Sequence, residues 1–133
     1  MEIKFRQAIG SDLKGVASFL GPFMESEFLL PRTDEELGKL IENGFVAEHD
    51  SKVVGFAAVE FYSKKLAEIQ CLAVDGEFRR RGIGKELVSR CITRAAEFNV
   101  VELMAISASD EMFKACGFDY SLPNQKRALF IQP

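Results

Sequence analysis

The chain has 133 residues, a length that fits one domain, and 47% of them are hydrophobic, which predicts a packed core rather than disorder. The net charge of −3 gives no overall electrostatic reason to expect nucleic acid as a partner, so any anion site has to be local. A single histidine and no paired cysteines exclude the usual zinc ligand sets, so we expect no metal.

The N-terminal third is expected to hold one strand and two helices. Alternating residues predict a strand over Ile3–Ala8. Ser11 offers an N-cap to a first helix, which we expect Gly21-Pro22 to end; its apolar residues recur at helical spacing, namely Leu13, Val16, Ala17 and Leu20. The capping-box sequence Thr33-Asp34-Glu35-Glu36 predicts a second helix over Asp34–Glu42, ended by Asn43-Gly44.

Three strands and the clearest helix are expected next. The strands are Phe45–Glu48, Val53–Tyr62 and Leu66–Val74, and the polar stretch 49–52 joins the first two as a hairpin. The helix covers Gly84–Phe98, and its apolar residues lie on one face.

The last third predicts a buried strand, a short helix and a final strand pair. The buried strand is Val100–Ile106, and the helix is Ser109–Cys116, closed by Gly117. The final pair lies near Phe118–Tyr120 and Arg127–Ile131. The order β-α-α-β-β-β-α-β-α-β-β predicts a single α/β (α+β) domain over residues 1–133, with a mixed sheet covered by helices.

The chain shows no sign of export or of a membrane span. Its first ten residues, MEIKFRQAIG, are too charged for a signal peptide, and no apolar run approaches ~18 residues. The cysteines Cys71, Cys91 and Cys116 are odd in number and widely spaced among apolar neighbours, which predicts free thiols in a reducing compartment. We therefore expect a cytoplasmic protein with no membrane partner.

The most informative stretch is a strand, a basic turn with two glycines, and then a helix. Helix N-termini present free N–H groups and a partial positive charge, and glycine lets a phosphate approach the backbone. Cations gather at this turn in an otherwise acidic chain: Arg79, Arg80, Arg81 and Lys85. The pattern predicts a pyrophosphate site; the alternative is a solvated basic turn.

Two other phosphate motifs do not fit this turn. A Walker A loop needs Ser or Thr after its lysine, and Lys85 is followed by Glu86. A dinucleotide fingerprint needs a third glycine where this chain has Leu87, and no second β-α-β unit follows.

The motif Arg79-x-x-Gly82-x-Gly84 after a strand resembles the acetyl-CoA signature of GNAT acetyltransferases, Arg/Gln-x-x-Gly-x-Gly/Ala, and the element order matches that fold along almost the whole chain. A nearer resemblance is to the acetyltransferase domain of N-acetylglutamate synthase and its short stand-alone relatives. It is carried by Leu29-Leu30-Pro31-Arg32 with Glu35-Glu36-Leu37, by Phe45-Val46-Ala47-Glu48, by Ala67-Glu68-Ile69 leading into Leu72-Ala73-Val74, and by Phe113-Lys114-Ala115-Cys116-Gly117-Phe118. The resemblance implies a mixed sheet with helices on both faces, and acetyl-CoA as the co-substrate.

The resemblance also implies which residues hold the cofactor. Backbone groups of Leu72, Ala73 and Val74 would pair with the pantetheine arm, and the N–H groups from Arg80 to Lys85, including Gly82, Ile83 and Gly84, would hold the pyrophosphate. One or two of the side chains of Arg79, Arg80 and Arg81 are expected on the adenosine 3′-phosphate or in solvent. Phe113 would pack either on the pantetheine or in the core.

Glu68 is the candidate general base. In regular β alternation it shares one strand face with Gln70 and Leu72, so it would point to the side where the acyl arm begins. An amine is mostly ammonium at neutral pH and must lose a proton before it attacks a thioester. The alternative is a solvent-facing glutamate at a strand start.

Other roles rest on looser correspondence. Arg32 would clamp a substrate carboxylate, and Lys126 and Arg127 lie where the family's second carboxylate anchor tends to be. The tyrosine that often protonates the leaving thiolate is missing from the penultimate helix; Ser107 and Ser109 are the hydroxyls there, and Tyr120 comes later. The cysteines look like core residues, so direct attack in a ternary complex is favoured over a covalent route.

The sequence thus predicts an N-acetyltransferase for a small-molecule amine, with the α-amino group of glutamate or another small acidic amino acid as the first acceptor to test. Two alternatives stay open. One is a GNAT enzyme for a polyamine, an aminoglycoside or a protein N-terminus. The other is a non-catalytic module that binds CoA. Because GNAT domains often pair, a homodimer is a further expectation.

Overall fold

The computed structural model describes residues 2–107, 110–120 and 129–133. Its helices and strands follow the order β1 (Lys4–Gln7), α1 (Leu13–Glu25), α2 (Asp34–Ile41), β2 (Gly44–His49), β3 (Lys52–Phe61), β4 (Leu66–Val74), α3 (Ile83–Glu97), β5 (Glu102–Met104) and α4 (Asp110–Ala115). Two short 3₁₀ turns, Gly10–Asp12 and Gly76–Phe78, precede α1 and α3. None of the helices in the described residues is long and apolar enough to cross a bilayer.

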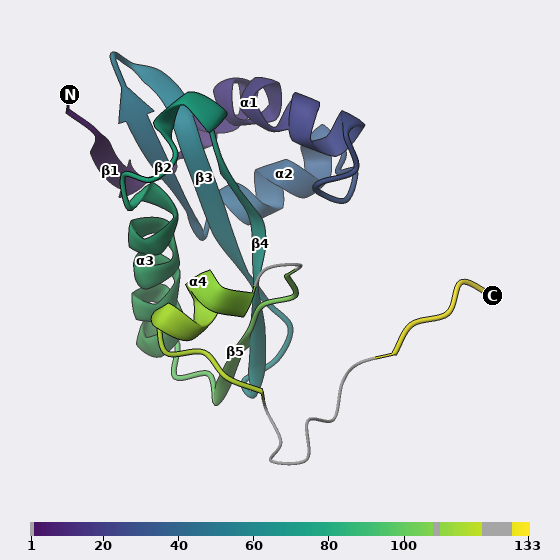
Figure 1. The fold of residues 1–133 in the computed structure, drawn as a ribbon. Helices are drawn as coiled ribbons and strands as arrows, with labels where there is room; N and C mark the ends of the chain where they lie inside the picture. Colours follow the sequence, from purple (N-terminus) through teal and green to yellow (C-terminus); the bar gives the residue numbers. More distant parts are fainter. Residues whose placement is uncertain (1, 108–109, 121–128) are drawn as a thin grey trace.

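The five strands form one sheet in the order β1-β2-β3-β4-β5. The first four run antiparallel to their neighbours, and β5 runs parallel to β4. Helices α1 and α2 lie on one face, and α3 and α4 lie on the other (Figure 1). The predicted α/β class, the mixed sheet and the helices on both faces are confirmed.

The sheet has a separate hydrophobic core on each face, which explains the alternating burial of its strands. The core under α1 and α2 contains Val16, Leu20, Leu37, Val46, Phe56, Cys71 and Ala73. The core under α3 and α4 contains Ala57, Val59, Ala67, Ile69, Leu87, Val88 and Cys91. Strand β4 therefore contributes side chains to both cores.

The predictions of α2 and of the β2–β3 hairpin, which rest on a few neighbouring residues each, agree with the structure. The Thr33 hydroxyl accepts the Glu36 N–H at 3.1 Å, and the Glu36 carboxylate accepts the Thr33 N–H at 2.9 Å, so the predicted capping box is formed. Between β2 and β3, Asp50 and Ser51 both have positive φ, as the tightest hairpin turns require.

The predicted boundaries of α1 were wrong at both ends. The side chain of Asp12, and not that of Ser11, accepts a backbone N–H before the helix, from Ile9 at 2.7 Å. The helix also continues past Gly21 and contains Pro22. Phe19, Phe23 and Met24 pack against the α1/α2 core, and this burial offsets the hydrogen bond that proline cannot make.

The C-terminal third differs most from the prediction. The strand expected over Val100–Ile106 covers Glu102–Met104 alone and is not buried, since it lies at the sheet edge beside Val101, which is 76% exposed. The stretch Phe118–Tyr120 is not a strand. Of the second predicted partner, residues 127 and 128 lie outside the described residues, and 129–131 form no strand.

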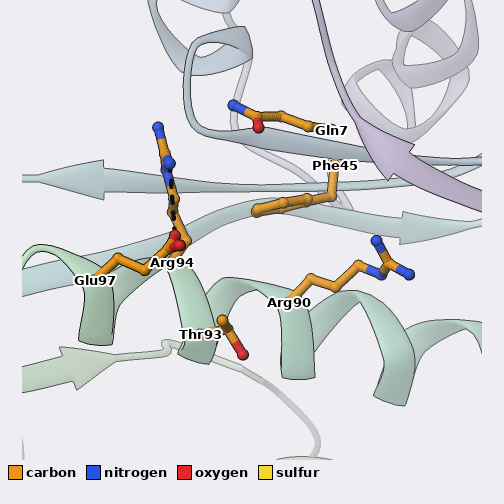
Figure 2. A pocket seen from close by; sticks show the side chains of 6 residues that line it. All are labelled: Gln7, Phe45, Arg90, Thr93, Arg94 and Glu97. Carbon is orange, nitrogen blue, oxygen red and sulfur yellow. Dashed lines mark ion pairs between the residues drawn. The ribbon is translucent and has the colours of Figure 1, made fainter.

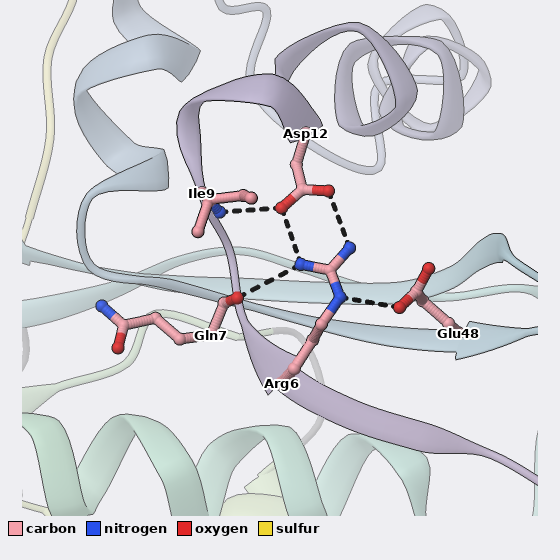
Figure 3. Close-up of polar contacts among 5 residues, drawn as sticks. All are labelled: Arg6, Gln7, Ile9, Asp12 and Glu48. Atoms are coloured by element: carbon pink, nitrogen blue, oxygen red, sulfur yellow. Dashed lines mark hydrogen bonds and ion pairs between the residues drawn. The ribbon is translucent and has the colours of Figure 1, made fainter.

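A fork of ion pairs ties β1 to the start of α1 and to β2 (Figure 3). The Arg6 guanidinium donates two hydrogen bonds to the Asp12 carboxylate, at 2.7 and 2.8 Å, and a third to Glu48 at 2.7 Å. Its hydrogen bonds hold the pKa of Asp12 below the ordinary value. Asp12 thus stabilises the fold above the pKa of an unfolded aspartate, and this contribution is lost as pH falls through the lower folded value.

We expect Asp12→Asn to lower the free energy of unfolding by about 1 kcal/mol at neutral pH, because the guanidinium loses its charged acceptor. The difference from the unmodified chain should narrow as the pH falls below about 3.9, where the carboxyl of the unfolded chain begins to protonate, and should be smallest below the lower pKa of the folded state. Urea unfolding of both proteins at neutral pH and at a pH below about 3.9 measures this difference in the free energy of unfolding. Equal stabilities at neutral pH would contradict this account of Asp12.

Candidate active site

Strand β4 carries a β-bulge that changes the face of its side chains. Ala58 stands opposite Gln70 and Phe56 opposite Ala73, so two residues of β4, Cys71 and Leu72, share the space across from one residue of β3. Cys71 adopts a left-handed backbone conformation, with φ of 58°. Regular alternation is interrupted there, which the sequence did not reveal.

The bulge corrects one step of the prediction for Glu68. Ala67 and Ile69 face the α3 core, and after the bulge Leu72 and Val74 pack against that same core, whereas Cys71 and Ala73 face the α1/α2 core. Glu68 and Gln70 therefore do not share a face with Leu72; they point to the α1/α2 side. The prediction assumed an unbroken period of two.

The edge of β4 that faces β5 is paired over a short length. The parallel ladder joins Leu66–Glu68 to Glu102–Met104, and it ends at Glu68. Beyond that point β4 pairs with β3 alone within the described residues. The backbone from Ile69 onward is thus not used by a strand on its second side, and Glu68 lies where the two parallel strands part.

The basic turn after β4 leads directly into α3. Gly82 is the N-cap of α3 and has φ of 77°, a conformation that costs side-chain-bearing residues roughly 1–2 kcal/mol. Its carbonyl accepts the Glu86 N–H at 3.0 Å, so the N–H groups of the three residues between them have no acceptor within the helix. All four cationic side chains of the turn are exposed: Arg79, Arg80, Arg81 and Lys85.

The side chains of Ile83 and Arg81 contact other parts of the protein, although the turn around them is exposed. The Ile83 side chain is buried under α3, which leaves its backbone N–H as the group that could meet a ligand. The Arg81 guanidinium lies 5.8 Å from the centre of the Phe78 ring, an arrangement that can hold the cation over the turn.

On the α1/α2 side of the sheet, five polar residues form what we call the Glu68 cluster. It consists of Arg32 from the α1–α2 loop, Glu60 at the end of β3, Tyr62 just after it, and Glu68 and Gln70 from β4. Cross-strand register explains the gathering, because Glu60 pairs with Glu68. The sequence predictions for Glu68 and Arg32 thus meet in one place.

Hydrogen bonds link the cluster from end to end. The Arg32 guanidinium donates to Gln70 Oε1 at 2.7 Å, and Gln70 Nε2 donates to the Tyr62 hydroxyl at 3.2 Å. That hydroxyl donates to Glu68 Oε1 at 2.6 Å and also lies 3.3 Å from Glu60 Oε1. Among the described residues Glu68 is the one charged side chain that the core buries, at 8% exposed.

The ionisation of Tyr62 fits its role as a donor. Desolvation of the phenol and its hydrogen bond to Glu68 raise the pKa of Tyr62 to about 12, so the hydroxyl keeps its proton at neutral pH. Arg32 forms no ion pair with an acidic side chain in the described part of the chain, so its positive charge is available to a ligand.

Arg32 reaches the sheet because its loop is fixed at both ends. Its backbone N–H donates to Met24 Sδ at 3.2 Å, and the next residue, Thr33, is the N-cap of α2. Sequence reasoning missed Tyr62 and Gln70. Gln70 could have been found two residues after Glu68, but Tyr62 requires the register of β3 with β4, which no local pattern gives.

The remaining predicted residues are more scattered. Phe113 lies in the α3/α4 core, 8% exposed, and packs edge-to-face on Phe118 with ring centres 5.3 Å apart. This placement agrees with the core alternative for that residue. Ser107 is exposed after β5. Ser109, Lys126 and Arg127 lie outside the described residues.

The two buried cysteine thiols, Cys71 and Cys91, show no sign of activation. Burial raises the pKa of Cys91 to about 12 and also raises that of Cys71. No group of three or more His, Cys, Asp or Glu side chains is placed to hold a metal ion in the described ranges.

A hollow of about 290 Å³ lies elsewhere, between α3 and the first two strands (Figure 2). Its lining consists of Gln7, Phe45, Arg90, Thr93, Arg94 and Glu97. The guanidinium of Arg94 is already bound to Asn43, at 3.0 Å, and to Glu97, at 3.5 Å. The hollow contains no residue of the basic turn or of the Glu68 cluster.

Comparison with known proteins defines the class. The model of the acetyltransferase (GNAT) family matches residues 15–118. The chain belongs to this family. It is an N-acetyltransferase that uses acetyl-CoA, and it is related to amino-acid acetyltransferases.

Two relatives illustrate the similarity in sequence. The uncharacterized N-acetyltransferase CT2212 of Chlorobaculum tepidum is 33% identical over 113 residues, which are 85% of this chain and 73% of that protein. The amino-acid acetyltransferase of Neisseria meningitidis is 30% identical over 131 residues, which are 94% of this chain. This chain spans about 30% of the length of that second protein.

Solved structures agree. N-acetylglutamate synthase from Neisseria gonorrhoeae, complexed with coenzyme A and N-acetyl-glutamate, superposes with a TM-score of 0.76 at 29% identity, covering 86% of this chain and 27% of that one. A Mycobacterium tuberculosis protein in complex with CoA and NLQ has a TM-score of 0.80 at 27% identity, covering 88% of this chain and 72% of that one. The predicted resemblance to the acetyltransferase domain of N-acetylglutamate synthase is confirmed.

Proposed function

We propose that this enzyme acetylates the α-amino group of a small acidic amino acid, glutamate first, by direct attack of the amine in a ternary complex. The observation that carries the proposal is the Glu68 cluster, in which a guanidinium without an ion-pair partner among the described residues and a buried carboxylate lie on one face, joined through Gln70 and Tyr62. A zwitterionic amino acid offers a carboxylate to Arg32 and an ammonium to Glu68. The names of the related amino-acid acetyltransferases support the same acceptor class.

Glu68 is the proposed base. Its position at the point where β4 and β5 separate puts a carboxylate beside the unpaired edge of β4. The acceptor ammonium would give its proton to the Glu68 carboxylate, directly or through a water, and the free amine would then be the nucleophile. The high pKa of the buried thiols supports attack by the amine itself rather than by a cysteine.

The basic turn and the edge of β4 are the proposed acetyl-CoA site. Acetyl-CoA supplies the acetyl group as an activated thioester. The free N–H groups of Ile83, Gly84 and Lys85 and the exposed cations of the turn suit its pyrophosphate, and a Cβ at Gly82 would meet no atom within 4 Å, so the backbone there is open to a ligand. The edge of Leu72–Val74 that faces away from β3, which pairs with no strand of the described residues, suits the amide groups of the pantetheine arm.

A thiol-release assay with acetyl-CoA and a panel of amines tests the acceptor. Turnover with glutamate, well above that with lysine or alanine, is the expected result. Turnover confined to polyamines, aminoglycosides or peptide N-termini would reject the proposed acceptor while keeping the enzyme class. Binding of acetyl-CoA with no acetylation of any amine would favour the non-catalytic alternative.

A second acceptor class has one observation in its favour. Glu60 stands directly opposite Glu68 in the sheet, so two carboxylates face the same side. A pair of like charges at this spacing would suit a polyamine, whose cations relieve their repulsion. For such an acceptor Arg32 would be unfavourable, and its removal should not reduce turnover.

Gly84→Asp is expected to raise the KM for acetyl-CoA by at least about tenfold, because a carboxylate in the first turn of α3 repels the pyrophosphate. Within the protein the new Cβ would lie 3.9 Å from Val74 Cγ2, an ordinary contact, so the fold should not suffer. Gly84→Ala is the matched control, since its Cβ takes the same place without a charge and the acetyl-CoA signature accepts alanine at this position. Both variants should unfold near or above the native temperature, and an unchanged KM in Gly84→Asp would contradict the proposed site.

A further inference from the structure

The hydrogen bonds of the Glu68 cluster can run in only one direction. An Arg32 guanidinium N–H can donate and cannot accept, so the Gln70 atom 2.7 Å away is the carbonyl oxygen. The amide nitrogen of Gln70 must then face Tyr62 and donate to its oxygen, at 3.2 Å. The single proton of the phenol is left for a carboxylate, and Glu68 Oε1, at 2.6 Å, is closer than Glu60 Oε1, at 3.3 Å.

This chain of contacts fixes one oxygen of Glu68 and leaves the other without a partner among the described side chains. A carboxylate held at one oxygen by a strong donor has little rotational freedom, so its second oxygen keeps a constant direction. Tyr62, which donates to this carboxylate, is 50% exposed and so is not a core packing residue. Glu68 itself is 8% exposed.

We propose that Tyr62 is a positioning residue for the reaction: it orients the Glu68 carboxylate for proton transfer, and Gln70 connects it to the substrate clamp Arg32. The proposal rests on the proposed role of Glu68 as base. It assigns no proton transfer to Tyr62 itself, because its pKa of about 12 keeps the phenol protonated throughout the cycle at neutral pH. Its contribution is to fix the direction of the Glu68 carboxylate.

Removing the hydroxyl has a consequence that packing alone would not produce. A donor to a carboxylate favours the ionised form, so its loss favours the protonated form. The ionisable groups that face the Tyr62 hydroxyl are Glu60 and Glu68, with Arg32 behind Gln70 and the buried thiol of Cys71 on the same side. The acidic limb of the pH profile of kcat should therefore move to higher pH.

The test is Tyr62→Phe, alone and combined with Glu68→Gln. The single variant is expected to lower kcat about tenfold, to shift the acidic limb upward and to leave the KM for acetyl-CoA unchanged. In the Glu68→Gln background the same change should have little further effect on the residual rate, because Tyr62 acts by orienting a base that the glutamine no longer supplies. A parallel cycle with Glu111→Gln, an exposed glutamate of α4 on the opposite face of the sheet, should show no such coupling.

The outcomes separate this inference from the function it builds on. If Glu68→Gln abolishes turnover but Tyr62→Phe leaves both kcat and the acidic limb unchanged, the inference is wrong and the base assignment stands. Full additivity of the two substitutions would also overturn it. If Glu68→Gln is fully active, the proposed base is wrong, and the role of Tyr62 is lost with it. A thermal unfolding curve for each variant identifies any loss of rate that comes from misfolding.

Discussion

Replacing Glu68 with glutamine is expected to lower kcat by about 10²- to 10⁴-fold while acetyl-CoA still binds with its native affinity. Glutamine has the shape of glutamate, and its amide oxygen can still accept the hydrogen bond from Tyr62, so the site should keep its geometry. What is lost is a group that can take a proton from the acceptor ammonium. The measurement is kcat for the preferred amine across a pH series, with CoA affinity determined by calorimetry.

The cross-strand neighbour provides the matched control. Glu60 lies opposite Glu68 on β3 and is less buried, so Glu60→Gln removes the same charge from the same face. Its effect on kcat should be less than about tenfold if Glu68 is the base. Equal losses in the two variants would mean that the negative charge of the face matters, and not one particular base. The deficit of Glu68→Gln should also shrink at high pH, where more of the amine is already deprotonated.

Arg32→Ala is expected to raise the KM for glutamate by about 10- to 100-fold, which corresponds to the loss of charge-assisted hydrogen bonds worth about 1.5–3 kcal/mol. The KM for acetyl-CoA should stay the same, because Arg32 lies in the α1–α2 loop and the basic turn lies before α3. Arg32→Lys should recover part of the effect, since it keeps the charge but not the planar fork. Initial rates with glutamate varied at saturating acetyl-CoA give the KM for glutamate, and rates with acetyl-CoA varied at saturating glutamate give the KM for acetyl-CoA.

Lys39→Ala controls for the simple loss of a positive charge. Lys39 is exposed in the last turn of α2 and belongs to the same loop-and-helix segment. Its removal should lower the free energy of unfolding by no more than about 1 kcal/mol and should leave the KM for glutamate unchanged. A native KM in Arg32→Ala would remove the carboxylate clamp from the proposal and shift attention to acceptors without a carboxylate.

The parts of the fold that the sequence predicted well are those set by local chemistry. The capping box at Thr33 and the apolar face of α3 are decided by residues within one or two helical turns of each other. The strand Leu66–Val74 agrees with the structure at both ends because its apolar residues and flanking turn residues are contiguous. Arg32 and Glu68 were singled out by their residue types and by the motifs that they share with the family, and the structure brings them into one cluster, while their roles stay predictions.

The parts that were missed depend on contacts between distant segments. Pro22 remains inside α1 because aromatic residues around it reach a core built by other elements, which outweighs a local helix-breaking signal. Tyr62 looked like the end of a strand, and only its register beside β4 shows that it meets Glu68. The length of β5 depends on whether a neighbouring layer covers its apolar residues, and a sequence pattern cannot report that.

The bulge at Cys71 also affects how this strand can be compared and redesigned. Residues up to Gln70 and residues from Leu72 onward follow two different inside–outside frames, although they belong to one strand. An alignment that shifts β4 by one residue relative to a relative would therefore exchange positions that face the α1/α2 side for positions that face the α3 core. A redesign of β4 should treat the residues before and after Cys71 separately and keep the extra residue between them.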